Sequence, residues 1–179
     1  MIDMEKAFKF RIYPNKTQQV LLQKTFGCTR YIYNYFLAKR IELYKQDKSS
    51  MSYNQCSKEL TVLKQELTWL KEPDKDALQK SLKDLDVAYK NFFARPEAGF
   101  PKFKSKHDRH KSYRTSYTNG NIKFLVKKIQ LPKLGKVKIK DKRTHLEGRI
   151  LNATVSREPD GKYYVSICCT DVPMVALET

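Results

Sequence analysis

The chain has 179 residues, of which 40% are apolar and 12% aromatic, a composition typical of a folded protein of one or two domains. Its 36 Lys and Arg against 19 Asp and Glu give a net charge of +17, which favours a polyanionic partner. No apolar run approaches the roughly 18 residues of a membrane span, and the first residues do not resemble a signal peptide, so we expect a cytoplasmic, nucleoid-associated protein. The four cysteines form no CxxC pair, which argues against a zinc site or a disulfide.

The first predicted element is a strand over residues 6–13, where apolar and polar side chains alternate and the outer face is basic. Pro14 ends this strand. Asn15 and Gln18, three residues apart, form the pattern of a capping box. This pattern predicts a helix from residue 16 to about residue 45, with a break at Gly27 as an alternative.

Two more helices are predicted after this one. Ser52 and Gln55 repeat the capping-box pattern, and Glu72-Pro73-Asp74 separates the second helix from the third. Apolar residues of the third helix follow one another at intervals of four, three, four and three, which places them on one face. We expect this stripe in the core of a helical bundle. Its members are Leu78, Leu82, Leu85, Tyr89 and Phe92.

From Gly99 onward the pattern indicates strands. Val137 and Ile139 alternate with lysines, and the alternating segments 151–155 and 163–169 flank a turn at 158–162, which predicts a hairpin. The order of one strand, three or more helices and several strands is that of an α+β fold. We predict that the first strand rejoins the later strands in a single β-barrel and that the helices are an insertion between them.

The segment from residue 100 to residue 143 concentrates the positive charge. It holds 15 Lys and Arg against two Asp, a net charge of +13, with aromatic residues interleaved. Because cations neutralise phosphates and aromatic rings stack on bases, we interpret it as nucleic-acid-binding; a solvated lysine surface is the alternative. The candidate phosphate-binding residues are Lys102, Lys104, Lys106, Arg109, Lys111, Arg114, Lys136 and Lys138. Phe103 and Tyr113 are candidates for base stacking, with burial in the core as the alternative.

Five short motifs follow one another along the chain: Lys6–Asn15, Arg30–Asn34, Ala77–Gln79, Ala88–Phe93 and Gly99–Lys104. Together they resemble the N-terminal half of TnpB, a family of transposon-encoded RNA-guided DNA endonucleases. The resemblance implies a WED domain, an oligonucleotide-binding-like barrel, made of residues 1–15 and 95–171. It also implies a helical REC domain inserted at residues 16–94.

The family has a RuvC nuclease domain after this half, in which clustered carboxylates hold the metal for phosphodiester cleavage. Residues 172–179 would begin the linker to that domain, and the 179 residues contain no such carboxylate cluster. We therefore expect this polypeptide to be catalytically inert by itself and to hold no cofactor, since the divalent metal belongs to RuvC. Its expected partners are a guide RNA and target double-stranded DNA; its oligomeric state is open.

The resemblance also assigns residues that read the short DNA motif beside the target. Lys75, Gln79 and Lys83 are four residues apart and share one helix face, for which a solvated surface is the alternative. The positions that match the family are Tyr53, Ser57, Lys75, Gln79, Thr118 and Asn119. Two other functions stay open: a nuclease-dead RNA-guided DNA-binding repressor, and a basic RNA-binding protein that uses no guide.

Overall fold

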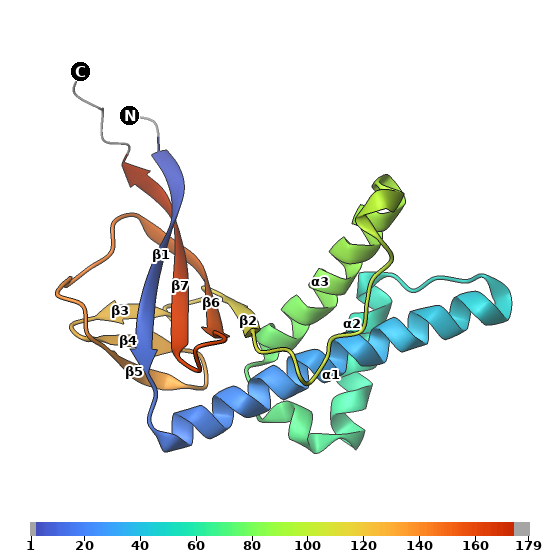
Figure 1. The fold of residues 1–179 in the computed structure, drawn as a ribbon, viewed down its shortest axis with the longest axis horizontal. Helices are drawn as coiled ribbons and strands as arrows, with labels where there is room; N and C mark the ends of the chain where they lie inside the picture. Colours follow the sequence, from blue (N-terminus) through green and yellow to red (C-terminus); the bar gives the residue numbers. More distant parts are fainter. Residues whose placement is uncertain (1–2, 174–179) are drawn as a thin grey trace. The chain divides into compact units, whose positions relative to one another are not determined.

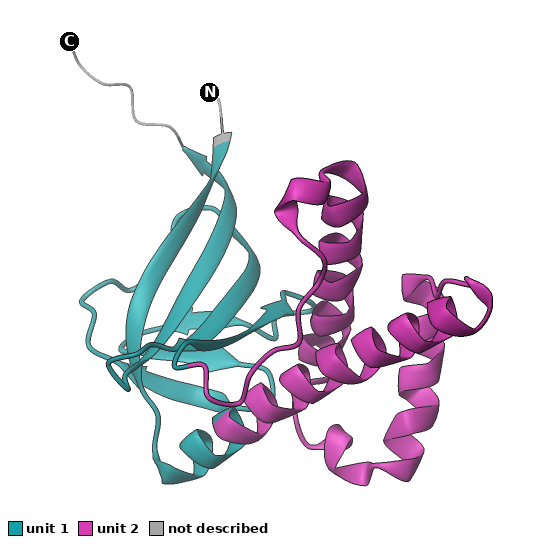
Figure 2. Ribbon diagram, turned by 45° about the vertical axis from the view of Figure 1, so that its right-hand side comes forward, with its two compact units in different colours: residues 1–22, 109–179 teal, residues 23–108 magenta. Residues whose placement is uncertain are grey.

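The structure, a computed structural model, describes residues 3–173 (Figure 1). It divides into two compact units (Figure 2): unit 1 comprises Met1–Leu22 and Arg109–Thr179, and unit 2 comprises Gln23–Asp108. In the part of the chain that the structure describes, no helix is both long and apolar enough to cross a membrane. The elements are β1 (Asp3–Tyr13), α1 (Lys16–Asp47), α2 (Tyr53–Glu66), η1 (Thr68–Lys71), α3 (Lys75–Ala94), η2 (Pro96–Ala98), β2 (Lys111–Ser116), β3 (Lys123–Leu125), β4 (Lys128–Leu131), β5 (Gly135–Ile139), β6 (Arg149–Arg157) and β7 (Tyr163–Pro173).

Unit 1 contains an antiparallel seven-stranded sheet in the order β2-β6-β7-β1-β5-β4-β3. The first strand of the chain lies in the middle of this order, where Phe10 pairs with Val165 of β7 and Ile12 pairs with Ile139 of β5. The predicted hairpin is confirmed as β6 and β7. The sequence thus correctly predicts an α+β fold in which the first strand rejoins strands from the end of the chain.

The predicted closed barrel is wrong, although the sheet curls strongly. The rings of Phe10 in β1 and Phe124 in β3 lie 5.2 Å apart. A flat sheet would separate these strands by roughly 14 Å, because β5 and β4 lie between them and neighbouring strands are about 4.8 Å apart. No ladder joins β2 to β3 within residues 3–173, so the sheet stays open. A tight turn at 118–121 takes the chain out of β2, and the three residues of β3 pair only with β4.

The passage from β1 into α1 is stabilised by the predicted capping box. The side-chain oxygen of Asn15 accepts from the Gln18 backbone N–H at 2.8 Å, and the Gln18 side chain accepts from the Asn15 N–H at 3.0 Å. The Gln18 amide nitrogen also donates to the carbonyls of Leu134 and Lys136, at 3.3 and 2.8 Å. One side chain therefore caps the helix and attaches its first turn to the start of β5. Helix α1 then runs to Asp47 without the alternative break at Gly27.

Unit 2 has a helical core to which α1, α2 and α3 contribute. Leu78, Leu82 and Leu85 of the predicted stripe are buried, and Tyr89 packs against them while partly exposed. The second capping box is confirmed at Ser52 and Gln55, and the side chain of Asp74 caps α3 by accepting from the Asp76 N–H at 3.1 Å. These caps explain why the helices begin where they do, since each satisfies backbone N–H groups that have no partner within the helix.

The conformation of Gly148 generates a prediction about stability. Its φ is +82°, and an added Cβ would lie 2.3 Å from the Thr170 carbonyl oxygen. Gly135 has a similar φ of +77°, but its Cβ would meet no atom within 4 Å. We expect Gly148→Ala to lower the free energy of unfolding by about 3 kcal/mol or more, and Gly135→Ala by only about 1–2 kcal/mol, the cost of a left-handed residue. Urea unfolding of the two variants measures this, and equal losses would contradict it.

Candidate nucleic-acid interface

Three of the predicted DNA-reading residues of unit 2, Tyr53, Ser57 and Gln79, form a hydrogen-bonded cluster between α2 and α3. The side-chain oxygen of Gln79 accepts from the Tyr53 hydroxyl at 2.9 Å and from the Ser57 hydroxyl at 3.1 Å. These two bonds use both lone pairs of the amide oxygen. No hydrogen bond runs from the Gln79 amide nitrogen to any residue within 3–173. The cluster therefore orients the Gln79 side chain as a hydrogen-bond donor.

The electrostatic surroundings favour this arrangement. Burial and the nearby Asp76 carboxylate raise the pKa of Tyr53 above its ordinary value, so its hydroxyl keeps the proton that it donates. The ammonium of Lys83 lies 5.2 Å from the centre of the Tyr53 ring. Burial and the positive charge of Lys75 lower the pKa of Lys64, and the nearby Asp74 carboxylate opposes this effect.

The other two predicted DNA-reading residues lie in unit 1, in the loop between β2 and β3. Asn119 and Gly120 both have positive φ values, +51° and +72°, the combination that a type I′ turn requires. The Asn121 side chain holds this loop by accepting from the Thr118 N–H at 2.8 Å and donating to the Ser116 carbonyl at 3.0 Å. The side chains of Thr118 and Asn119 are left exposed at the tip.

The lysines of the segment 102–106 do not lie in a strand, as their alternation suggested, but in an extended loop of unit 2. Asn34 of α1 holds this loop through two backbone bonds to Lys104, donating to its carbonyl at 2.9 Å and accepting from its N–H at 2.8 Å. The Lys104 ammonium lies 4.4 Å from the centre of the Tyr33 ring. Phe103 is 56% exposed, so its ring is available for stacking.

The outward side of the sheet in unit 1 carries two rows of polar side chains, set by the strand register. One row runs Arg114, Thr154, Ser166, Lys9, and the next runs Ser112, Ser156, Tyr164, Arg11. We call these eight residues the outer sheet face. Hydroxyl groups occupy its middle, and cations occupy β1 and β2 at its sides. Two of these hydroxyls already have partners: that of Ser156, only 7% exposed, donates to Glu158 at 3.2 Å, and that of Tyr164 donates to Asp160 at 2.9 Å. The Glu158 carboxylate also contacts Lys9 at 3.3 Å and His110 Nε2 at 3.4 Å.

The positive charge continues from β1 onto β5 and β4. Tyr13 pairs with Lys138, which pairs with Lys128, so the three share a face. Arg11 and Lys140 lie over the Tyr13 ring, 4.7 and 4.6 Å from its centre. Of the predicted phosphate-binding residues in unit 1, Arg109, Arg114, Lys136 and Lys138 are exposed, and Lys111 is half-buried.

Tyr113 does not fit its predicted role. Its side chain points to the inward side of β2 and is only 6% exposed, so its ring belongs to the core and cannot stack on a base. The alternative of core burial, which the sequence left open, is the correct one for Tyr113.

Within residues 3–173, the buried thiols and the carboxylates form neither a reactive cysteine site nor a metal site. Burial raises the pKa of Cys28 to about 11, with Glu72 adding to the effect, and burial also raises the pKa values of Cys56 and Cys169. Such thiols stay protonated and are poor nucleophiles. Within the described ranges, no three His, Cys, Asp or Glu side chains lie close enough together to hold a metal ion. The basic surfaces are what this part of the molecule presents to a partner.

Unit 1 carries a basic curled sheet and unit 2 displays an oriented amide, and both are features of nucleic-acid-binding proteins. A family profile described as a helix-turn-helix domain of the OrfB/IS605 type matches residues 1–49. A Streptomyces pristinaespiralis protein, provisionally named an RNA-guided DNA endonuclease, is 34% identical over 96% of this chain and 43% of its own length. The RNA-guided DNA endonuclease InsQ of Escherichia coli K12, also a provisional name, is 36% identical over 90% of this chain and 40% of its own length.

The virulence protein VsdF of Salmonella dublin is 33% identical over 59% of this chain and 98% of its own length. The chain belongs to the TnpB family of transposon-encoded RNA-guided DNA endonucleases, and it spans about two-fifths of the length of the two endonuclease relatives.

The fold of residues 3–49 is not the helix-turn-helix that the matched profile describes. Residues 3–49 form the strand β1 and one uninterrupted helix, α1, so no helix-turn-helix lies in this region. In a helix-turn-helix the second helix enters the major groove. The predicted DNA-reading residue Gln79 lies on α3, outside the matched residues 1–49.

The cysteine environments generate a second prediction. Cys168 is half-exposed and lies on the outward side of β7, beside Ser166 in the adjoining row, where it pairs with Ala7 and Asn152. We expect iodoacetamide at pH 8 to alkylate Cys168 first, because the other three thiols are buried and keep their protons. Peptide mass spectrometry after timed quenching measures the order of labelling. Early labelling of Cys28 or Cys169 would contradict the environments described.

Proposed function

We propose that this chain is the nucleic-acid-recognition part of a TnpB-type RNA-guided DNA endonuclease and that the outer sheet face binds guide RNA. The observation that carries the proposal is the register that aligns Arg114, Lys9 and Arg11 around rows of hydroxyl groups. Cations neutralise phosphates, and the hydroxyls of Ser112, Thr154 and Ser166 can donate to phosphate oxygens and to ribose 2′-hydroxyls. The names of the relatives support an RNA and a DNA partner.

On this proposal, unit 1 corresponds to the WED domain and unit 2 to the REC domain. The proposed boundaries follow the family, with residues 1–15 and 95–171 in WED and 16–94 in REC. The boundaries between the two compact units lie after residues 22 and 108 instead. The first turn of α1 belongs to unit 1 because Gln18 attaches it to β5, and the loop 102–106 belongs to unit 2 because Asn34 holds it.

We further propose that the cluster on α2 and α3 reads the DNA motif beside the target, with Lys75 close by and Thr118 and Asn119 contributing from unit 1. A glutamine that pairs with adenine in two places needs both its oxygen and its nitrogen. Because Tyr53 and Ser57 occupy the oxygen, Gln79 is restricted to donating. It would therefore donate to one acceptor, such as guanine O6 or N7, thymine O4 or adenine N7, without the two-bond pairing that distinguishes adenine.

A second candidate function is RNA-guided DNA binding without cleavage. It is favoured by one observation, namely that VsdF aligns over 98% of its length with 59% of this chain, so a relative only about three-fifths as long as this chain exists. Both candidates require guide-dependent DNA binding. They differ only in whether a nuclease domain acts on the bound DNA. A basic RNA-binding protein that uses no guide would show RNA binding without any guide-dependent DNA binding.

Cys168 makes the RNA proposal directly testable, because this thiol lies on the same side of the sheet as the proposed binding residues. The RNA that copurifies with the chain is sequenced, transcribed and added back before iodoacetamide treatment. We expect labelling of Cys168 to slow in proportion to the fraction of chain bound. A chain that is saturated with RNA yet labelled at the unbound rate would show that the RNA lies elsewhere.

The salt dependence of binding adds a matched comparison. Arg114→Ala and Lys138→Ala should each flatten the log–log salt slope by about 0.7 to 0.9, the contribution of one phosphate contact. Lys71→Ala serves as the control, because this lysine is exposed at the end of η1 in unit 2 and lies outside the sheet. Equal effects of all three substitutions would indicate diffuse attraction rather than a defined site.

The Gln79 cluster generates a prediction about DNA specificity. Gln79→Ala should cost about 1–3 kcal/mol for the preferred sequence and relax the preference at one or two positions. Tyr53→Phe combined with Ser57→Ala frees the amide oxygen, so the preference should shift toward adenine, with which Gln79 can then pair through both its oxygen and its nitrogen. The measurement is binding of the RNA-loaded chain to duplexes randomised beside the target. Lys104→Ala is the control and should weaken all sequences alike. A preference that survives Gln79→Ala unchanged would refute the role of the cluster.

A further inference from the structure

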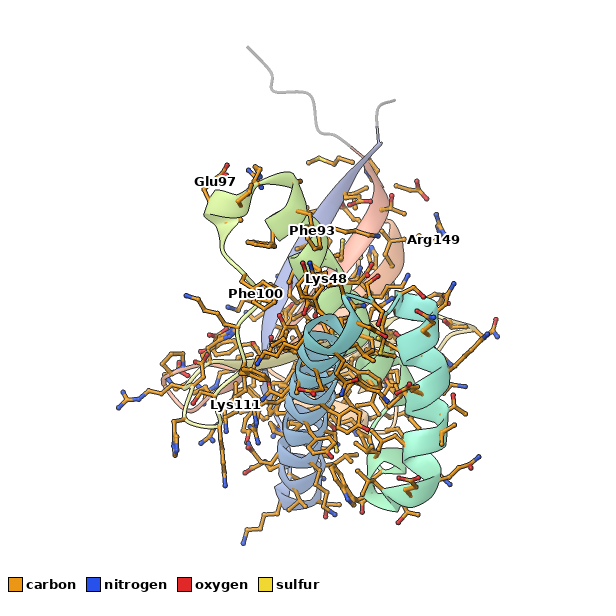
Figure 3. All side chains as sticks on the ribbon, turned by 90° about the vertical axis from the view of Figure 1, so that its right-hand side faces the viewer. Lys48, Phe93, Glu97, Phe100, Lys111 and Arg149 are labelled. Carbon is orange, nitrogen blue, oxygen red and sulfur yellow. The ribbon has the colours of Figure 1, made fainter. Side chains whose placement is uncertain are left out.

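An aromatic groove in unit 2 takes no part in the interface described so far. It has a volume of about 540 Å³ and lies between the last turns of α1, the residues that precede α2, the end of α3 and Phe100. Figure 3 views the molecule from this side, with Phe93, Phe100 and Lys48 labelled. The volume falls within the range of small-ligand sites, roughly 300–1,000 Å³.

The walls of the groove are aromatic rings whose faces remain accessible. Phe93 is 74% exposed and Tyr44 is 61% exposed. Tyr89 lies nearly parallel to Phe93 at 6.3 Å, and its ring meets Phe100 edge-on at 5.5 Å. Single exposed apolar residues are common on proteins, but rings from three segments that converge on one groove are not explained by the packing of the core.

The charged groups of the groove leave a positive excess. Arg40 is only 8% exposed; its guanidinium lies over the Tyr89 ring at 4.9 Å and contacts Asp86 through one nitrogen at 3.5 Å. The Nε of Arg40 has no hydrogen-bond partner among the described residues. Asp86 also binds Lys90, at 3.0 Å. With Lys45 at the rim, three cations face one carboxylate, so an anionic occupant complements the groove.

We propose that this groove binds single-stranded nucleic acid by stacking an unpaired base on Phe93 and Tyr44, with the flanking phosphates held by Lys45 and Lys90. Exposed rings beside cations are the recurring features of single-strand binding, because every base has a face to stack while the bases of a duplex hide theirs. This proposal rests on the proposed function and adds a second nucleic-acid site to it. A second copy of the chain is disfavoured as occupant, because two chains of net charge +17 repel each other.

The test uses the full chain and an oligothymidylate of about 12 nucleotides, with 5-iodouracil at one position for photochemical cross-linking. We expect cross-links to peptides that contain Tyr44, Phe93 or Phe100. Phe93→Leu combined with Tyr44→Leu keeps the side chains apolar but removes the rings, and should reduce this cross-linking at least about fivefold, the lower limit for one lost stacking contact. Trp69→Leu removes a ring of η1 that is 42% exposed and lies outside the groove; it is the matched control and should leave the cross-linking unchanged.

Three results would overturn the proposal. Cross-links confined to other segments would do so, as would equal affinity for an oligonucleotide with abasic sites throughout. Self-association or binding of an acidic peptide, abolished by the leucine variant, would show instead that the groove is a protein interface. Protection of Cys168 by the copurifying RNA is measured in the same variant and in the unaltered chain. In the unaltered chain, intact protection of Cys168 with no groove cross-link refutes the groove alone, whereas absence of protection refutes the proposed function itself.

Discussion

The fold of unit 1 depends on the pairing of β1 with strands that are distant in sequence. Within residues 3–173, the halves β2-β6-β7 and β5-β4-β3 are joined in one sheet only through this strand. Phe10 and Ile12 contribute buried side chains at the junction, while Lys9 and Arg11 point outward and complete the polar rows. The chain segment enclosed by this pairing includes all of unit 2. The fold tolerates so long an enclosed segment because each doubling of the length of a loop adds only about 0.6 kcal/mol to the entropic cost of closing it.

The elements with strong local signals were predictable from the sequence. Both capping boxes, the apolar stripe of α3 and the hairpin of β6 and β7 depend on residues close together in the chain, so their patterns are legible without a structure. The family resemblance brought Tyr53, Ser57 and Gln79 together as candidates. Their geometry was not predictable, because the direction of one amide depends on two hydroxyls from another helix.

Features that depend on strand register or on sheet curvature could not be predicted from the sequence. The hydroxyl rows cross four strands, and no strand by itself shows that Thr154 stands beside Ser166. The closed barrel was expected from the strand pattern, but closure requires β2 and β3 to pair, and no ladder joins these two strands within residues 3–173. Tyr113 and Phe103 are both aromatic residues among lysines, yet one faces the core and the other faces solvent. The difference follows from the strand that holds Tyr113 and the loop that holds Phe103.

The central position of β1 has a consequence for synthesis of the protein. This strand leaves the ribosome before β5 and β7 and cannot pair with them until they have been translated, whereas unit 2 is contiguous and can fold as soon as its last residue emerges. During that interval β1 has two unpaired edges, the condition under which strands of neighbouring nascent chains associate. Lys6, Lys9 and Arg11 place positive charge along this strand. Two of these cations, Lys9 and Arg11, which we propose as nucleic-acid contacts in the finished protein, therefore also repel neighbouring unpaired strands.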